Sequence, residues 1–209
     1  MNSLKSDELR VTLSRIWMIN HNAKESFELC KYLYHPETRE ELNYINNDIG
    51  IQYLRHLSWR NTVVELCKLF SNRNTDKYNL SHFLNQLNLN QYFGDLGIDE
   101  NQLILWKARI KSLSNPISKI LNLRDKVYSH TDNINPSSLE TPSLKDVESL
   151  IVFVEDILQK LYSLTQNTYL DTETLIVNSK GFSMVKNLVE LQNRQSSEII
   201  DMINNYKKK

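Results

Sequence analysis

Hydrophobic residues recur every three or four positions along most of this chain, which is the spacing of one face of an α helix. The pattern predicts helices over about 6–20 and 22–34, and the second should stop at His35-Pro36 because proline cannot continue a helix. One long helix is then expected from Glu37 to Ser71. Its apolar seam alternates strictly by three and four, as in bundle helices packed lengthwise on their neighbours.

Two polar residues, Gln52 and His56, interrupt the seam of this long helix one turn apart. One interpretation is a satisfied polar pair in the core, or a stretch of helix that faces solvent. The other is that both side chains line the same polar groove as Arg124, a residue of the second half of the chain. The pattern also leaves open the role of Glu65, on the same helix.

The second half of the chain continues the helical pattern. A short helix is expected around residues 80–87, and Asp99 should cap the next one. The apolar seam of that helix continues in phase across Pro116 and takes in Arg124 near its end. We therefore favour one kinked rod over two helices that meet at Asn115-Pro116.

The last two helices differ in character. Ser143 is a good N-cap for a helix over 144–164, which carries the broadest apolar stripe and should be central. A final helix over about 182–206 has an apolar face that thins in its middle. We expect it to pack across the surface or against a partner subunit. Together these elements predict an all-α fold, an antiparallel helical bundle that forms a single domain over 1–209.

Composition narrows the class of protein. The chain has 209 residues, 40% hydrophobic and 24% charged, with only four glycines and four prolines, which suits a helical globular domain. Twenty-five basic residues balance twenty-five acidic ones, so there is no overall basic field, and nucleic acid could only be held by a local patch. Neither a signal peptide nor a membrane span is expected.

The two cysteines, Cys30 and Cys67, stand alone in helical patterns, so we expect buried free thiols and a cytoplasmic location. No pair of histidines has a spacing typical of zinc ligands. The sequence therefore predicts neither a metal site nor a cofactor.

Arg124 and His130 are the residues with the clearest chemical potential. Arg124 lies on the apolar seam, and His130 follows where turn-forming residues begin. An arginine is always charged and its planar fork of donors fits phosphate, while a histidine exchanges protons near neutral pH. On an ideal helix the two would lie about 120° apart and about 9 Å along the axis. A purely structural interpretation is an Arg124 ion pair with Glu65 or Asp125.

The stretch Leu123-Arg124-Asp125-Lys126-Val127-Tyr128-Ser129-His130-Thr131-Asp132 resembles the signature of the HEPN superfamily: an arginine, a polar residue and a histidine after a short spacer. The form Arg-Asp-Lys followed by His-Thr-Asp is especially similar to a branch associated with phage abortive infection. Residues 56–70 and 80–84 also resemble that branch. The resemblance covers about 37–165, a HEPN-like four-helix core, which leaves 1–36 and 181–209 as helical extensions.

This resemblance implies a homodimer with two Arg/His sets facing one cleft, and a metal-independent endoribonuclease acting in phage defence or as a toxin. His130 would move a proton at the ribose 2′-OH or the leaving oxygen, and Arg124 would stabilise the transition-state charge. Asp125 would orient Arg124 or its partner across the dimer. We assign Lys126, Tyr128 and Thr131 to substrate binding. RNA is the expected partner, with an antitoxin protein as another.

One departure from the pattern concerns control. HEPN toxins paired with nucleotidyltransferase antitoxins often carry a tyrosine two residues after the histidine, and here that position is Asp132. The resemblance therefore does not extend to that mode of regulation. Two alternatives to the nuclease stay open: a non-catalytic HEPN dimer that binds nucleotide, RNA or a partner protein, and a structural helical protein in which Arg124 pairs with a carboxylate away from any cleft.

Overall fold

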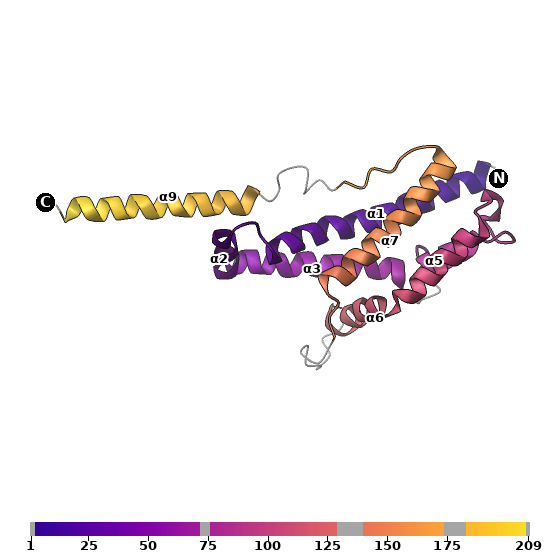
Figure 1. The fold of residues 1–209 in the computed structure, drawn as a ribbon, viewed down its shortest axis with the longest axis horizontal. Helices are drawn as coiled ribbons and strands as arrows, with labels where there is room; N and C mark the ends of the chain where they lie inside the picture. Colours follow the sequence, from indigo (N-terminus) through magenta and orange to yellow (C-terminus); the bar gives the residue numbers. More distant parts are fainter. Residues whose placement is uncertain (1–2, 72–75, 129–139, 174–182, 208–209) are drawn as a thin grey trace. The chain divides into compact units, whose positions relative to one another are not determined.

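The computed structural model describes residues 3–71, 76–128, 140–173 and 183–207. Within these residues every regular element is a helix, which confirms the all-α class (Figure 1). The chain divides into two compact units. Unit 1 comprises Met1–Phe27 and Trp59–Thr172, and unit 2 comprises Glu28–Ser58 and Glu173–Lys209.

The first helix, α1, is continuous from Ser3 to Tyr34, so the prediction of two helices over 6–20 and 22–34 was wrong. No glycine or proline lies near the expected break, and the amide of Asn20 donates to the carbonyl of Ile151 at 3.3 Å. Because that side chain is used in a tertiary contact, it does not compete for the helix's own backbone. The end of α1 before His35-Pro36 is confirmed.

The predicted long helix is instead two, α2 (Arg39–Asn47) and α3 (Ile49–Phe70). Asp48 between them has an extended backbone, with φ −100° and ψ 112°. Its carboxylate accepts from the backbone N–H of Ile51 at 2.9 Å, so it serves as the N-terminal cap of α3. A short capping residue thus breaks a hydrophobic periodicity that by itself reads as uninterrupted.

The core of unit 1 is formed by apolar faces of α1, α3, α4 (Leu80–Gln86), α5 (Glu100–Ser112), α6 (Ser114–Leu123) and α7 (Leu144–Gln166). Helix α7 is central, as predicted, because eight of its residues are buried. Ser143 caps it in a capping box with Asp146. The predicted caps at Asp99 and Ser143 are both confirmed.

The predicted kinked rod across Pro116 was wrong. Helix α5 ends at Ser112 and α6 begins at Ser114, with Leu113 between them at φ −89° and ψ 9° (Figure 1). A proline has no N–H to donate to the carbonyl four residues earlier, and its ring clashes with that carbonyl, here the one of Ser112. Leu113 nevertheless stays buried, which explains why the hydrophobic phase crosses the break unchanged.

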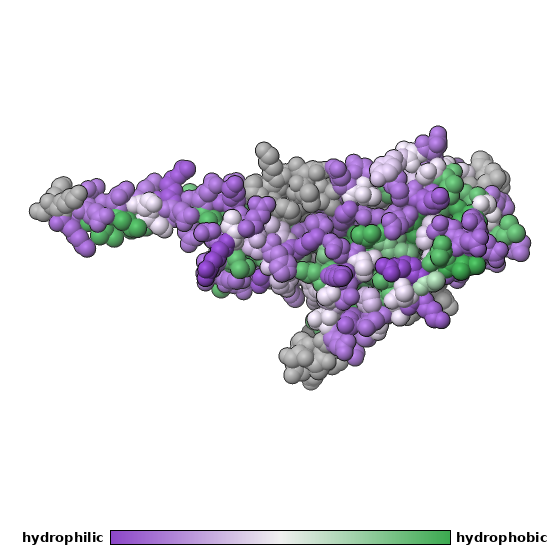
Figure 2. Space-filling model, in the orientation of Figure 1, coloured by the Kyte–Doolittle hydropathy of each residue, from purple (hydrophilic) through white to green (hydrophobic). Residues whose placement is uncertain are grey.

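Unit 2 has a small core of its own, to which α2, α3 and α9 (Ser183–Tyr206) contribute. Val185 near the start of α9 is buried, whereas the helix is exposed from residue 190 onward. Apolar side chains form a patch on this exposed part (Figure 2). The predicted last helix is confirmed, and its packing against a partner subunit stays a prediction.

Gln52 and His56 lie in the N-terminal half of α3, which belongs to unit 2 and has solvent-exposed positions. His56 is exposed, and the amide of Gln52 donates to the carbonyl of Asn46 at 2.6 Å. This agrees with the interpretation in which the seam faces solvent. None of the described helices combines the length and the hydropathy needed to cross a lipid bilayer.

Candidate functional site

The predicted site residues begin where α6 ends. Arg124 to Tyr128 form a turn of π helix that continues from α6. Such turns are rare and frequently mark functional sites. Because a π turn is wound more widely than an α helix, the angle of about 120° projected from ideal α geometry no longer applies. His130 and Thr131 lie outside the described residues.

Arg124 is held by its neighbour in sequence. Its Nε donates to Oδ1 of Asp125 at 2.7 Å, with the arginine side chain 18% exposed and the aspartate side chain 48% exposed. Glu65, the other carboxylate expected as a partner, forms an ion pair with Lys68. The contact to Asp125 uses Nε rather than the two terminal Nη nitrogens, so one ion pair orients the guanidinium without occupying its whole fork of donors.

The electrostatic surroundings keep Arg124 charged. The hydrogen bond that Arg124 donates to Asp125 raises the pKa of Arg124, and the nearby carboxylates of Asp125 and Asp76 act in the same direction, while partial burial opposes them. Asp76 belongs to the segment that follows α3, so a carboxylate distant in sequence also acts electrostatically on Arg124. The result is a fixed positive charge at the end of α6.

Cys67 is a buried residue near this arginine, and its thiol is unreactive. Burial raises the pKa of its thiol to about 12, and the Sγ atom donates to the carbonyl of Ile120 at 3.3 Å. Cys30 in unit 2 is likewise buried, with its pKa raised to about 12. Both are free thiols, as predicted, and neither forms a thiolate nucleophile at neutral pH.

A groove of about 500 Å³ opens beside Arg124 in unit 1. One face of α6 lines it, together with the C-terminal end of α5 and Ser71, and Arg124 and Asp125 stand at one end. The structural alternative predicted a bridged arginine away from any cleft. Here the arginine is bridged and also lines a groove, so the ion pair and a binding role are compatible.

The remaining predicted residues differ in setting. Lys126 is exposed, and Tyr128 is half-buried. The guanidinium carbon of Arg60, from α3, lies 5.7 Å from the centre of the Tyr128 ring, within the range of a cation–π contact. Sequence reasoning missed Arg60. It falls within the stretch 56–70 that carries the family resemblance, but nothing in the linear pattern connects it to Tyr128.

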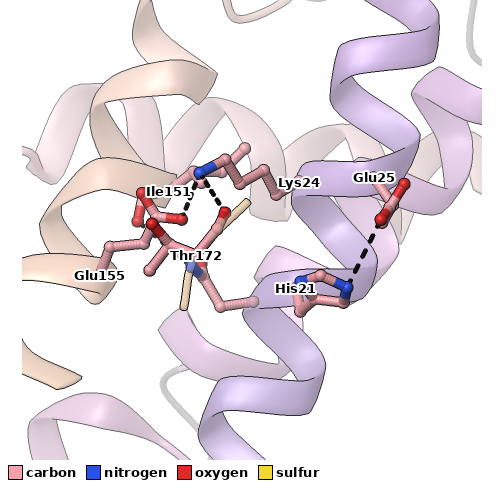
Figure 3. Close-up of polar contacts among 7 residues, drawn as sticks. His21, Lys24, Glu25, Ile151, Glu155 and Thr172 are labelled. Carbon is pink, nitrogen blue, oxygen red and sulfur yellow. Dashed lines mark hydrogen bonds and ion pairs between the residues drawn. The ribbon is translucent and has the colours of Figure 1, made fainter. Parts of the chain in front are cut away.

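A second polar cluster joins α1 to α7 in unit 1 (Figure 3). Lys24 donates to Glu155 at 2.7 Å and to the carbonyl of Thr172 at 2.8 Å, with about four-fifths of each charged side chain buried. On the same helix His21 contacts Glu25 at 3.5 Å and stacks on Trp17. Each charge here has a partner, so this cluster ties the chain after α7 to α1 rather than presenting groups to a ligand.

Among the residues that the structure describes, no three His, Cys, Asp or Glu side chains gather as a metal site. The predicted absence of a metal remains a prediction.

With the fold and the arginine site in view, the class of protein follows. The chain belongs to the HEPN superfamily, to which an all-α bundle and the sequence around Arg124 pointed. Its family is AbiU2: the family model HEPN_AbiU2 matches residues 24–181, well over half of the chain. The protein is therefore an HEPN protein of the abortive-infection branch. The match extends beyond the predicted core of 37–165 at both ends. No curated protein and no solved structure matches the chain.

Proposed function

We propose that this AbiU2-family protein is a metal-independent endoribonuclease that acts in phage defence or as a toxin, with Arg124, Asp125 and His130 as its catalytic set. The observation that carries the proposal is the setting of Arg124. A permanent cation on an otherwise apolar seam is oriented through Nε by Asp125 and stands at the end of a groove. A guanidinium held in this way keeps its terminal nitrogens as donors for a ligand in the groove.

Arg124 would stabilise the transition state of phosphodiester cleavage. Negative charge grows on the non-bridging oxygens as the phosphorus gains a fifth substituent, and a donor fixed in advance stabilises that charge without having to reorganise. The terminal nitrogens of Arg124 suit this role because Asp125 is bound through Nε. A lysine would supply the charge but not the planar pair of donors.

His130 would supply the proton chemistry. As a base, it takes the proton from the ribose 2′-OH, so that this oxygen attacks the adjacent phosphorus, and water gives a proton to the departing 5′-oxygen. As an acid, it gives its own proton to the departing 5′-oxygen, and water takes the proton of the 2′-OH. The products are a 2′,3′-cyclic phosphate and a 5′-OH, and DNA is resistant because it has no 2′-OH.

Substrate contacts in this proposal come from around the catalytic set. Lys126 is exposed and offers its ammonium to a phosphate. Tyr128, with Arg60 against its ring, offers an aromatic and cationic surface for a base and its backbone. Thr131 is assigned to the same role from its place in the sequence. Since the chain has no net charge, selectivity for a structured RNA suits it better than avid general binding.

The active form is proposed to be a homodimer in which two such sets face one cleft, with RNA as substrate and an antitoxin as a further partner. Light scattering on purified protein tests the dimer directly. A monomer at concentrations that support cleavage would remove the composite site from the proposal and leave the chemistry of each set unchanged.

The decisive experiment is RNA cleavage by purified protein in the presence of EDTA, with His130→Ala and Arg124→Ala beside the wild type. We expect the wild type to cut RNA and to leave cyclic phosphate ends, and both variants to lose at least about a hundredfold in rate. RNA in which the cleaved nucleotide is 2′-deoxy should not be cut. If His130→Ala cuts as fast as the wild type while remaining folded, the protein is not a nuclease of this kind.

A further inference from the structure

The groove beside Arg124 extends well beyond the three proposed catalytic residues. On α6 its rim is a ladder of exposed polar side chains, Ser114, Ser118 and Asn122, spaced four residues apart and therefore on one helical face. The amide of Asn122 donates to the hydroxyl of Ser118 at 3.4 Å, which links two rungs of the ladder. Hydroxyl and amide groups of this kind can both donate and accept hydrogen bonds.

The floor of the groove is apolar. Ile117 is almost fully buried, and Ile110 and Leu121 are half-buried, so their side chains form a surface below the polar ladder. A flat heterocycle could lie against such a floor while its edge faces the ladder. The volume of about 500 Å³ falls within the range of small-molecule sites, about 300–1,000 Å³.

Two cations line the groove, one beyond each end of α6. Arg124 follows the C-terminal end of α6, and Lys111, an exposed residue in the last turn of α5, precedes its N-terminal end. From Ser114 to Arg124 the helix rises by ten residues, which corresponds to about 15 Å. That length exceeds one nucleotide, so a bound strand would extend along the groove and meet a cation at two separate phosphates.

Cations at both ends, an apolar floor and a polar rim match the parts of a single RNA strand. Phosphates require the cations, bases prefer the apolar floor, and 2′-hydroxyls can bond to serine and asparagine. Asp125 also lines this end, and its pairing with Arg124 offsets part of both charges. A phosphate here would therefore be bound through hydrogen bonds from the terminal nitrogens of Arg124 more than through net charge.

We propose that this groove is the subsite for the nucleotides on one side of the cleaved phosphate, with Lys111 as the distal phosphate contact and Asn122 as a contact to sugar or base. The inference rests on the proposed ribonuclease function, because it takes Arg124 as the contact to the cleaved phosphate. It adds a binding site on α5 and α6 to the short motif in the π turn.

The test measures RNA binding apart from cleavage. In a His130→Ala background, binding of a fluorescein-labelled single-stranded RNA of mixed sequence is followed by anisotropy over a series of KCl concentrations. The test variants are Lys111→Gln and Asn122→Ala, both of exposed residues. The matched control is Lys160→Gln, an exposed lysine on α7 outside the groove. Circular dichroism confirms that each variant is folded.

Lys111→Gln should weaken binding about three- to tenfold and reduce the slope of log affinity against log salt by about 0.7, the contribution of one phosphate contact in a single strand. Asn122→Ala should weaken RNA binding without changing the slope of log affinity against log salt. It should also reduce the ratio of the affinity for RNA to the affinity for DNA of the same sequence. Lys160→Gln should bind as the parent does. If Lys111→Gln binds with the parent's affinity and slope, the subsite is refuted.

Failure of the subsite and failure of the nuclease are distinguishable. Cleavage by the wild type with unaltered binding by Lys111→Gln refutes the subsite and leaves the nuclease. Dependence of RNA binding on Lys111 without any cleavage by the wild type supports the groove as an RNA-binding site, but it refutes the nuclease and with it the place of the groove beside a cleaved phosphate. A His130→Ala protein that binds no RNA refutes the subsite outright.

Discussion

Replacement of Arg124 by lysine separates charge from geometry. Lysine keeps the positive charge and a long aliphatic stem but presents a single ammonium group instead of a planar fork. In the wild type, Nε binds Asp125 while the terminal nitrogens are the proposed donors to phosphate. One ammonium cannot do both with the same geometry, so Arg124→Lys should remain folded and lose most of its activity.

The magnitudes follow from the exposures. The carboxylate of Asp125 is about half exposed, so water can solvate it when the arginine is removed, and the ion pair should contribute only about 0–1 kcal/mol to stability. The arginine side chain is 18% exposed, and loss of its two methylenes beyond Cβ in Arg124→Ala adds roughly 1.5 kcal/mol. Loss of one preorganised donor costs about 2.7–4 kcal/mol in the transition state, or a hundred- to a thousandfold in rate.

Two assays check these numbers. Urea unfolding followed by circular dichroism should give a change within about 1 kcal/mol for Arg124→Lys and a loss of about 1.5–2.5 kcal/mol for Arg124→Ala. Single-turnover cleavage of end-labelled RNA should fall at least tenfold for Arg124→Lys and at least a hundredfold for Arg124→Ala. Arg109→Lys, at an exposed arginine of α5, is the matched control and should match the wild type in both assays. Cleavage by folded Arg124→Lys at the wild-type rate would refute the argument from geometry.

Three further predictions concern groups outside the proposed chemistry. The N–H of Ser143 holds the pKa of the Asp146 carboxyl below its ordinary value. The ionised carboxylate therefore adds stability at pH values above its unfolded-state pKa, and this stability is lost as the pH falls through its folded-state pKa. Asp146→Asn should lower the Tm at neutral pH, and in a thermal-melt series the difference from the wild type should shrink below about pH 4. An undiminished difference at low pH would contradict this account. Because burial raises the pKa of the Cys67 thiol to about 12, iodoacetamide at neutral pH should modify this thiol only as fast as the protein unfolds. Labelling is read by mass spectrometry, and rapid labelling of the native protein would show that the thiol is accessible. A double-mutant cycle of Lys24→Met and Glu155→Gln, measured by urea unfolding, should give a coupling free energy of about 1.5–3 kcal/mol, because the pair is largely buried and hydrogen-bonded. A coupling below about 0.5 kcal/mol would mean that the contact is not stabilising.

Part of the fold could be predicted because its causes are local. The caps at Asp99 and Ser143 depend on a side chain and the backbone two or three residues away, so their residue types were sufficient to locate them. The end of α1 before Pro36 has the same local origin.

The incorrect helix boundaries show the limit of periodicity. Leu113 and the residues around Asp48 keep the hydrophobic phase across a break, because the helices on both sides still bury their apolar faces in a core. A pattern of burial therefore does not report whether the backbone hydrogen bonds continue. At Asn20 the error was the opposite, because a helix break was predicted where α1 is continuous. The side-chain amide of Asn20 donates to the carbonyl of Ile151, a residue from a distant part of the chain.

For the site, the sequence by itself determined which residue types stand near the end of α6 and the resemblance that indicated the family, because residue types and their spacing are properties of the linear chain. Only the tertiary structure decided which carboxylate holds Arg124 and that Arg60 contacts Tyr128. It alone also decided that Lys111 and the polar ladder of α6 line one groove with that arginine. The physical reason is that packing, and not local propensity, sets which side chains meet. Arg60 and Tyr128 come from distant helices, and the turn between α5 and α6 decides which of their faces line one groove.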